Sequence, residues 1–202
     1  MKPAGIILAG GQARRMGGGD KGEAVLAGRS LFDRVIDRLA PQLPAIAINA
    51  NGPKERLAEY SLPVIADPVP DHPGPLAGVL AGMIWAESLG YDHIVTVAAD
   101  TPFFPEDLVE RLIRAAEKAK TPIAMAAIME EGRLIRQPTF ALWPVRLQSA
   151  LREALAKDQR RVVHFADHFG SASTLFATEA FFNINTPEDL AEAEALLKDG
   201  TT

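Results

Sequence analysis

Short apolar segments alternate with amphipathic segments along this chain, and the alternation limits its fold more than any other feature. The apolar segments have the length of strands, and the segments between them repeat apolar residues at intervals of three and four. Such a pattern predicts an α/β fold with a mainly parallel central sheet. No repeat, low-complexity segment or linker divides the 202 residues, so we expect one domain over residues 1–202.

Two capping signals mark where helices begin. Ser30 with Asp33 resembles a capping box, and Thr186 before Pro187 is typical of a helix N-terminus. The expected helices begin at Leu31, at residue 76 (ending near 89), near residue 105, near 145 (to 157), near 160 (to 169) and at 187 (to 198). The expected strands cover residues 5–8, 45–49, 63–66, 93–98, 123–129, 138–142, 173–177 and 181–185.

Four of the expected strands are followed by a glycine or a polar residue. Gly10, Asn49, Asp67 and Asp100 each lie at the carboxyl end of such a strand. In open parallel sheets, ligands bind at this edge, near the point where the strand order reverses. Asn49 and Asp67 would be ordinary turn residues if each stood alone, but the four coincidences together favour one shared site.

The loop at residues 8–21 carries the strongest functional signal. Gly10 and Gly11 have no side chain, so backbone N–H groups there can approach a phosphate or a purine edge closely. Arg15 and Lys21 add positive charge, which a merely flexible glycine turn would not need. The loop contains no glycine-lysine-serine or glycine-lysine-threonine sequence, so it is not a Walker A loop. It predicts a site for the phosphates of a nucleoside triphosphate.

Asp100 is the candidate metal ligand. Its carboxylate directly follows an apolar strand, and Mg²⁺ takes oxygen ligands and usually bridges to substrate phosphates. The alternative is a capping or turn aspartate, and the basic loop on the neighbouring strand favours the metal. His164 and His168 have i, i+4 spacing but no accompanying motif, which is more typical of an exposed helix face.

Composition excludes several other kinds of protein. The chain has no cysteine, so it forms neither disulfides nor thiolate metal sites. Its net charge of −5 argues against general nucleic-acid binding, which usually needs a basic surface. No apolar run approaches the roughly 18 residues that span a bilayer. Residues 1–11 show no signal-peptide cleavage pattern, and we therefore expect a cytoplasmic protein without membrane contact.

Several of these segments together resemble the molybdenum cofactor guanylyltransferases. The resemblance runs from Gly5 to about Leu196 and rests on residues 8–21, 49–51, 74–78, 100–102, 137–139, 160–162 and 183–190 and on Asp67. It implies a Rossmann-like nucleotidyltransferase domain that transfers GMP from GTP to molybdopterin with Mg²⁺. The products would be molybdopterin guanine dinucleotide and pyrophosphate. Transient contact with other molybdenum cofactor proteins is a further expectation.

The resemblance also implies roles for individual residues. The positions that would contact GTP are Leu8, Ala9, Gly10, Lys21, Asn49, Asp67 and Asp100. Asp100 would also hold the metal, and the pterin would lie toward Arg160, Arg161, Asn183 and Asn185. In the proposed reaction Arg15 and Lys21 stabilise charge on the departing pyrophosphate. Related cytidylyltransferases tend to carry Ala-Ala-Gly where this chain has Ala9-Gly10-Gly11, which favours guanine.

Two other functions stay open at this point. One is a different nucleotidyltransferase, which uses CTP on the pterin or another triphosphate on a sugar phosphate. The other is a nucleotide-binding or carrier module that binds GTP without turning it over. Asp100 together with Lys21 argues against the module, because a carrier needs no metal at the α-phosphate.

Overall fold

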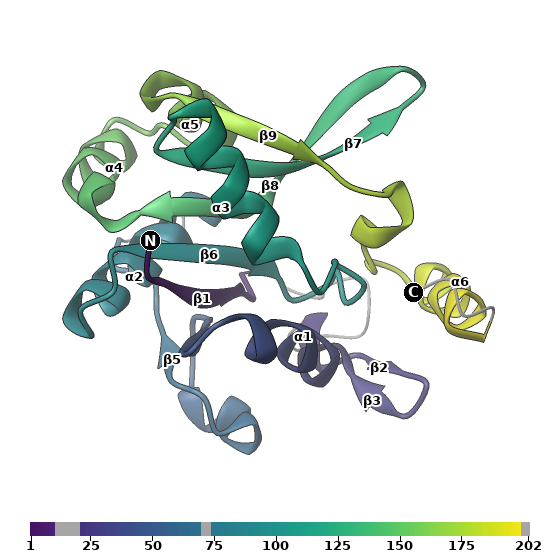
Figure 1. Ribbon diagram of the computed structural model, residues 1–202. Coiled ribbons are helices and arrows are strands. Elements are labelled where there is room, and N and C mark those ends of the chain that lie inside the picture. Colours follow the sequence, from purple (N-terminus) through teal and green to yellow (C-terminus); the bar gives the residue numbers. More distant parts are fainter. Residues whose placement is uncertain (11–20, 70–73, 199–202) are drawn as a thin grey trace.

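The computed structural model describes residues 1–10, 21–69 and 74–198, and these form an α/β fold around a seven-stranded sheet. The strands of the sheet are β1 (Pro3–Leu8), β4 (Ile46–Asn49), β5 (Val64–Ile65), β6 (His93–Ala98), β7 (Ile123–Glu130), β8 (Arg133–Pro144) and β9 (Ser171–Leu175). They lie in the order β5-β4-β1-β6-β8-β7-β9, and β8 alone runs antiparallel to its neighbours (Figure 1). The prediction of a mainly parallel sheet is confirmed.

Helices cover both faces of this sheet. Apolar side chains of α1 (Leu31–Leu39) and α3 (Leu108–Ala119) belong to the core on one face. Those of α2 (Pro75–Ser88), α4 (Gln148–Ala156) and α5 (Val162–Phe169) belong to the core on the other. Short 3₁₀ helices lie at Lys21–Glu23, Ala40–Gln42, Lys54–Tyr60, Val145–Leu147 and Thr178–Phe181. None of the helices within the described ranges is long and apolar enough to cross a membrane.

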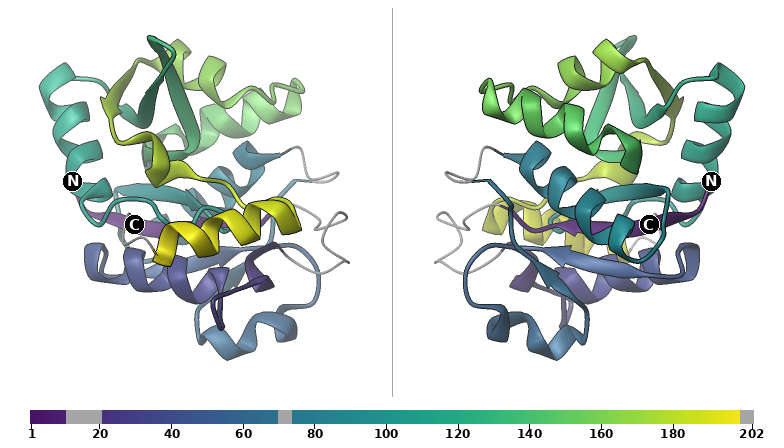
Figure 2. Two further views of the ribbon diagram at one scale, coloured as in Figure 1. Left: turned by 90° about the vertical axis from the view of Figure 1, so that its right-hand side faces the viewer. Right: turned by 90° about the vertical axis from the view of Figure 1, so that its left-hand side faces the viewer.

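A third, smaller core joins the C-terminus to the N-terminal half. Strands β2 (Val25–Leu26) and β3 (Arg29–Ser30) form a separate hairpin, and α6 (Pro187–Lys198) packs beside it. Leu26, Ile184 and Ala193 are buried together there. Figure 2 (left) shows α6 lying across the side of the molecule at which β1 and β6 end. Helix α6 is thereby brought next to the carboxyl edge of the sheet.

Both predicted helix starts have the expected caps. The hydroxyl of Ser30 accepts the N–H of Asp33 at 3.0 Å and donates to its carboxylate at 2.7 Å. The hydroxyl of Thr186 accepts the N–H of Asp189 at 3.1 Å, and the Asp189 carboxylate accepts the N–H of Thr186 at 2.9 Å. A cap of this kind stabilises a helix by about 1 kcal/mol, because it satisfies N–H groups that have no partner within the helix.

The strand expected at residues 181–185 is wrong. Phe181 ends a 3₁₀ helix, and the chain then continues without regular structure to α6. Phe181 and Ile184 are apolar because they are buried in two different cores, not because they alternate along a ladder. The sequence also did not predict the β2–β3 hairpin or the 3₁₀ helix at Lys54–Tyr60.

Candidate functional site

Four neighbouring strands end at one edge of the sheet. In the ladders, Leu8 of β1 lies opposite Asn49 of β4 and Ala98 of β6, and Asn49 lies opposite Ile65 of β5. The four strand ends that the sequence singled out are therefore adjacent. The structure brings Gly10, Asn49, Asp67 and Asp100 to the same edge, as expected for a shared site.

The chain leaves β1 through two more ladder bonds before it reaches Gly10. The N–H of Ala9 donates to the carbonyl of Asn49 at 2.9 Å, and the carbonyl of Leu8 accepts the N–H of Ala99 at 3.1 Å. These bonds fix the backbone of Leu8 and Ala9, whose side chains are buried. Gly10 is exposed, and a Cβ there would meet no described atom within 4 Å. Packing among the described residues thus does not explain its lack of a side chain, whereas close approach of a ligand to the backbone would.

Asn49, Asn51 and Asp67 form a hydrogen-bonded cluster beside β1. The amide of Asn49 donates to one carboxylate oxygen of Asp67 at 2.9 Å, and the amide of Asn51 donates to the other at 2.8 Å. The side-chain oxygen of Asn51 accepts the N–H of Asp67 at 2.9 Å. Both oxygens of the carboxylate are bound, so its orientation is fixed. Sequence reasoning placed Asn49 and Asp67 at this edge but did not predict that Asn51 joins them.

Helix α2 packs against this cluster through a glycine. Asn49 is only 3 % exposed, and its side-chain oxygen would lie 2.2 Å from a Cβ placed on Gly78. A Cβ at Gly78 would also lie 2.7 Å from Leu8. Only glycine lets α2 come close enough to cover both residues. The start of α2, at Gly74 and Pro75, follows a loop whose residues 70–73 lie outside the described residues.

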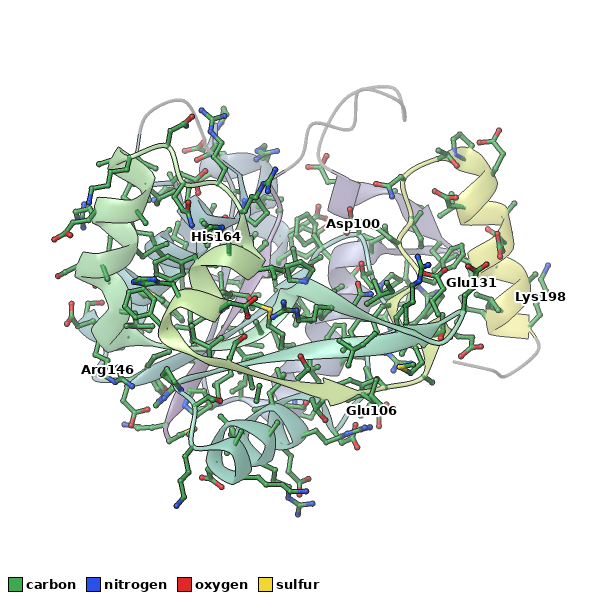
Figure 3. The ribbon with its side chains drawn as sticks, turned by 90° about the horizontal axis from the view of Figure 1, so that it is seen from above. Asp100, Glu106, Glu131, Arg146, His164 and Lys198 are labelled. Atoms are coloured by element: carbon green, nitrogen blue, oxygen red, sulfur yellow. The ribbon has the colours of Figure 1, made fainter. Side chains whose placement is uncertain are left out.

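Asp100 lies on the other side of β1, where the C-terminal segment meets the sheet. Its backbone carbonyl accepts the N–H of Ile184 at 2.8 Å, and its carboxylate accepts the hydroxyl of Thr101 at 3.3 Å. Ile184 is fully buried and stands between Asn183 and Asn185. Figure 3 shows Asp100 between α5, which carries His164, and α6, which carries Lys198. The structure therefore brings the two asparagines next to the candidate metal ligand, although they lie far apart in sequence.

The structure does not test the charged residues of the first loop. Arg15 lies outside the described residues. Lys21 begins the 3₁₀ helix at Lys21–Glu23, but its side chain is not described. The next residue, Gly22, packs so closely on Phe32 that a Cβ would lie 2.5 Å from the ring. The 3₁₀ helix that follows the loop is thus fixed against α1, and this contact fixes the position of the Lys21 backbone.

Arg160 and Arg161 lie just before α5. Arg160 binds the carboxylate of Asp158 at 2.6 Å, and Arg161 is exposed at the N-terminus of the helix. His164 and His168 are exposed on α5, as the sequence predicts. Within residues 1–10, 21–69 and 74–198, no three histidine or carboxylate side chains cluster in a way that could hold a metal ion by themselves.

Helix α5 is tied to the β7–β8 hairpin by an ion pair. The guanidinium of Arg136 donates to both carboxylate oxygens of Asp167, at 2.5 and 2.8 Å, and Ser171 donates to the same carboxylate at 2.7 Å. The hydrogen bonds from Arg136 and Ser171 lower the pKa of Asp167 to about 2, because they stabilise its ionised form. This contact joins β8, α5 and the start of β9.

Comparison with known proteins identifies relatives over the whole site. The family described as MobA-like NTP transferase domain matches residues 5–171. A molybdenum cofactor guanylyltransferase of Mesorhizobium japonicum is 46 % identical over 207 residues, covering 98 % of both chains. One from Rhodopseudomonas palustris (strain BisB5) is 51 % identical and covers 95 % of this chain and 92 % of the relative.

Solved structures agree on the fold. Molybdopterin-guanine dinucleotide biosynthesis protein A from Archaeoglobus fulgidus superposes with a TM-score of 0.74 at 24 % identity, over 98 % of this chain and 100 % of that one. A CMP:2-keto-3-deoxy-manno-octonic acid synthetase, solved with CTP, gives a TM-score of 0.76 at 12 % identity, over 99 % and 100 %. Both support a nucleotidyltransferase fold for the sheet and its helices.

Proposed function

The chain belongs to the MobA-like NTP transferase family and, within it, to the molybdenum cofactor guanylyltransferases, and from this premise we propose how its strand-end site works. The enzyme transfers GMP from GTP to molybdopterin and releases pyrophosphate. One observation carries the assignment of the site: four adjacent strands end at a single edge and bring Gly10, Asn49, Asp67 and Asp100 together.

GTP binds, in this proposal, where the chain leaves β1. The backbone of Leu8, Ala9 and Gly10 approaches the nucleotide, and this placement is supported by the absence of any described atom within 4 Å of a Cβ at Gly10. On the β4–β5 side, Asn49 and Asp67 hold the nucleotide through a network already fixed by their mutual hydrogen bond. Side chains held in place before binding lose little entropy when the ligand arrives, which favours affinity.

Asp100 would hold Mg²⁺ on the β6 side. Its carboxylate is a hard oxygen donor that is only partly buried at the strand end, which fits this ion. Mg²⁺ commonly binds through one or two protein carboxylates and takes its other ligands from water and substrate phosphates, so a larger cluster of acids is not required. When bound, the ion would supply positive charge at the phosphates of GTP.

The chemistry requires positioning and charge rather than a general base. A terminal phosphate oxygen of molybdopterin, already ionised at neutral pH, forms a bond to the α-phosphorus of GTP. The bond from that phosphorus to the bridging oxygen breaks, and pyrophosphate leaves with its electron pair. Arg15 and Lys21 would stabilise the charge on pyrophosphate, a role supported by their place in the basic loop.

The pterin substrate would lie toward the C-terminal segment. Asn183 and Asn185 support this, because the buried Ile184 between them binds the backbone of Asp100. Arg161, exposed at the start of α5, would neutralise the pterin phosphate. We further propose that the reaction takes place in the cytoplasm and that other molybdenum cofactor proteins meet the enzyme transiently.

Pyrophosphate release measured with molybdopterin and Mg²⁺ tests this function. GTP should support turnover at least about tenfold better than CTP, a difference of about 1.4 kcal/mol in transition-state stabilisation. Omission of molybdopterin is the matched control and should abolish release. A preference for CTP would contradict the guanine assignment, and GTP binding without release under any condition would identify a binding module instead.

A further inference from the structure

The sheet has an open edge at β9, far from the strand-end site. β9 is last in the strand order, and within the described residues it pairs only with β7. The N–H of Phe176 donates to the carbonyl of Ala127 at 2.8 Å, so the backbone groups of alternate residues point toward β7. Those of the residues between them point outward, namely Ser171, Ser173 and Leu175. The strand contains no proline and no charged residue, the usual means by which proteins protect such an edge.

A basic groove follows this edge. It lies between α3 and β9, encloses about 620 Å³, and is lined by three cations and no carboxylate. The cations are Arg111, Arg114 and Lys118 of α3, and the remaining lining is Ala115, Ala119 and residues 172–175. Figure 1 shows α3 running beside β9 at the end of the sheet. A groove with three cations stands out in a chain whose net charge is −5.

One of these cations is fixed at the open edge. The guanidinium of Arg111 lies 3.9 Å from the ring centre of Phe176 and donates to the outward carbonyl of Leu175. Asp107 lies 3.7 Å from Arg111, and Glu110 pairs with Arg114. Both pairs join exposed side chains four residues apart at the start of α3, and such pairs contribute at most about 1 kcal/mol. A carboxylate entering the groove can therefore compete with them.

We propose that β9 and α3 bind an extended acidic segment of another protein. The segment would add a strand to the sheet through the outward N–H groups of β9 and the carbonyls of Ser171 and Ser173, with alternate side chains directed toward α3. Its carboxylates would then meet Arg111, Arg114 and Lys118. The phosphates of a nucleic acid could also bind these three cations, but a nucleic acid could not extend the hydrogen-bond ladder of the sheet.

A second copy of this chain fits the edge poorly. Two β9 strands paired about a two-fold axis would bring the cations of one α3 toward those of the other, and like charges in such an interface repel. The groove is also separated from the strand-end site by β8 and β7, which lie between β9 and β6. An acidic segment could thus remain bound during turnover, as a partner that delivers or receives a cofactor would require.

The test uses a short synthetic peptide that alternates glutamate with valine, and a matched peptide with lysine in place of glutamate. We expect saturable binding of the acidic peptide only, weakened by salt, with slower hydrogen exchange at the amides of Ser173 and Leu175. Lys118→Glu should weaken binding about tenfold or more, whereas Lys118→Arg should bind as the wild type does.

A second pair of variants tests whether binding depends on backbone hydrogen bonds from β9. Ser173→Pro removes an outward N–H without touching the β7 ladder and should abolish binding, whereas Ser173→Ala retains the N–H and should bind normally. Melting temperature and GTP turnover should be unchanged in both. The proposal would be overturned if the lysine peptide bound as tightly as the acidic one, or if inorganic phosphate displaced the acidic peptide as well as a second copy of that peptide does. It would also be overturned if the acidic peptide did not slow hydrogen exchange at β9. Concentration-dependent dimerisation that Ser173→Pro removes would overturn it too, because the edge would then join two copies of this chain.

Discussion

At the scale of single residues, the side chain and the backbone of Asp100 have different roles, one chemical and one structural. Its backbone carbonyl binds Ile184, and this contact does not depend on the side chain. Its carboxylate interacts in the structure with the hydroxyl of Thr101, a long contact at 3.3 Å. A change from carboxylate to amide keeps this backbone contact and the size of the side chain, so it should affect chemistry far more than folding.

Asp100→Asn tests this directly. We expect turnover to fall on the order of 10²–10³-fold, because the amide lacks the charge that holds a cation at the phosphates, while the melting temperature stays near that of the wild type. Pyrophosphate release over a Mg²⁺ titration gives the first value and thermal unfolding the second. Glu106→Gln, an exposed carboxylate labelled in Figure 3, is the control and should keep full activity. Wild-type activity in Asp100→Asn would refute the metal assignment.

Much at this scale could be predicted from the sequence. Gly10, Asn49, Asp67 and Asp100 were recognisable because each ends an apolar run that reads as a strand. The hydrogen bond between Asn51 and Asp67 could not be predicted, because it depends on how two connecting loops meet in space. A local pattern identifies strand ends but contains no information on the contacts between loops.

At the scale of elements, the contact of α2 with β4 decides whether Asn49 can be placed correctly. Gly78→Ala would put a methyl group 2.2 Å from the Asn49 oxygen and should cost about 1–3 kcal/mol of folding free energy. We also expect a raised KM for GTP, because Asn49 must move. Gly82→Ala is a matched control on the same helix, since its methyl group would instead press on Ile6 at 2.6 Å. It should lower the melting temperature without raising KM, and an equal rise in KM for both would contradict the role of Asn49.

The ion pair between α5 and β8 predicts a pH dependence. The pKa of Asp167 is lowered from 3.8 to about 2, so the folded state favours its ionised form. The pair therefore stabilises the fold fully above about pH 4, and this contribution is lost as the pH falls toward 2. In urea unfolding, the difference in stability between wild type and Asp167→Asn should shrink over this interval. A difference that stays constant from pH 5 to pH 2 would mean that the ionised pair contributes nothing.

At the scale of the whole molecule, the site follows from the order of the strands. The chain moves from β1 to β4 and β5 on one side, then crosses through α2 to β6 on the other side of β1. Helices α1 and α2 therefore cover opposite faces, and the carboxyl end of β1 lies at the switch point where α/β proteins bind ligands. The loop at residues 8–21 leaves the sheet at this point.

Nucleotide binding should therefore stabilise the fold as a unit. GTP with Mg²⁺ should raise the melting temperature more than CTP or ATP at equal concentration, because a ligand at 100 times its dissociation constant adds about 2.7 kcal/mol to the folded state. Thermal unfolding over a concentration series of each nucleotide measures the ranking. A larger effect of CTP would contradict the choice of guanine.

The sequence by itself determined the α/β class, both helix caps and the strand-end positions of the site, because each depends on residues close together in the chain. It misjudged residues 181–185, whose apolar side chains enter two separate cores. Only the tertiary structure decided that this segment lies against Asp100, that α2 covers Asn49 through a glycine, and that β9 is left as an open edge. Those features depend on contacts between residues distant in sequence, which no local pattern records.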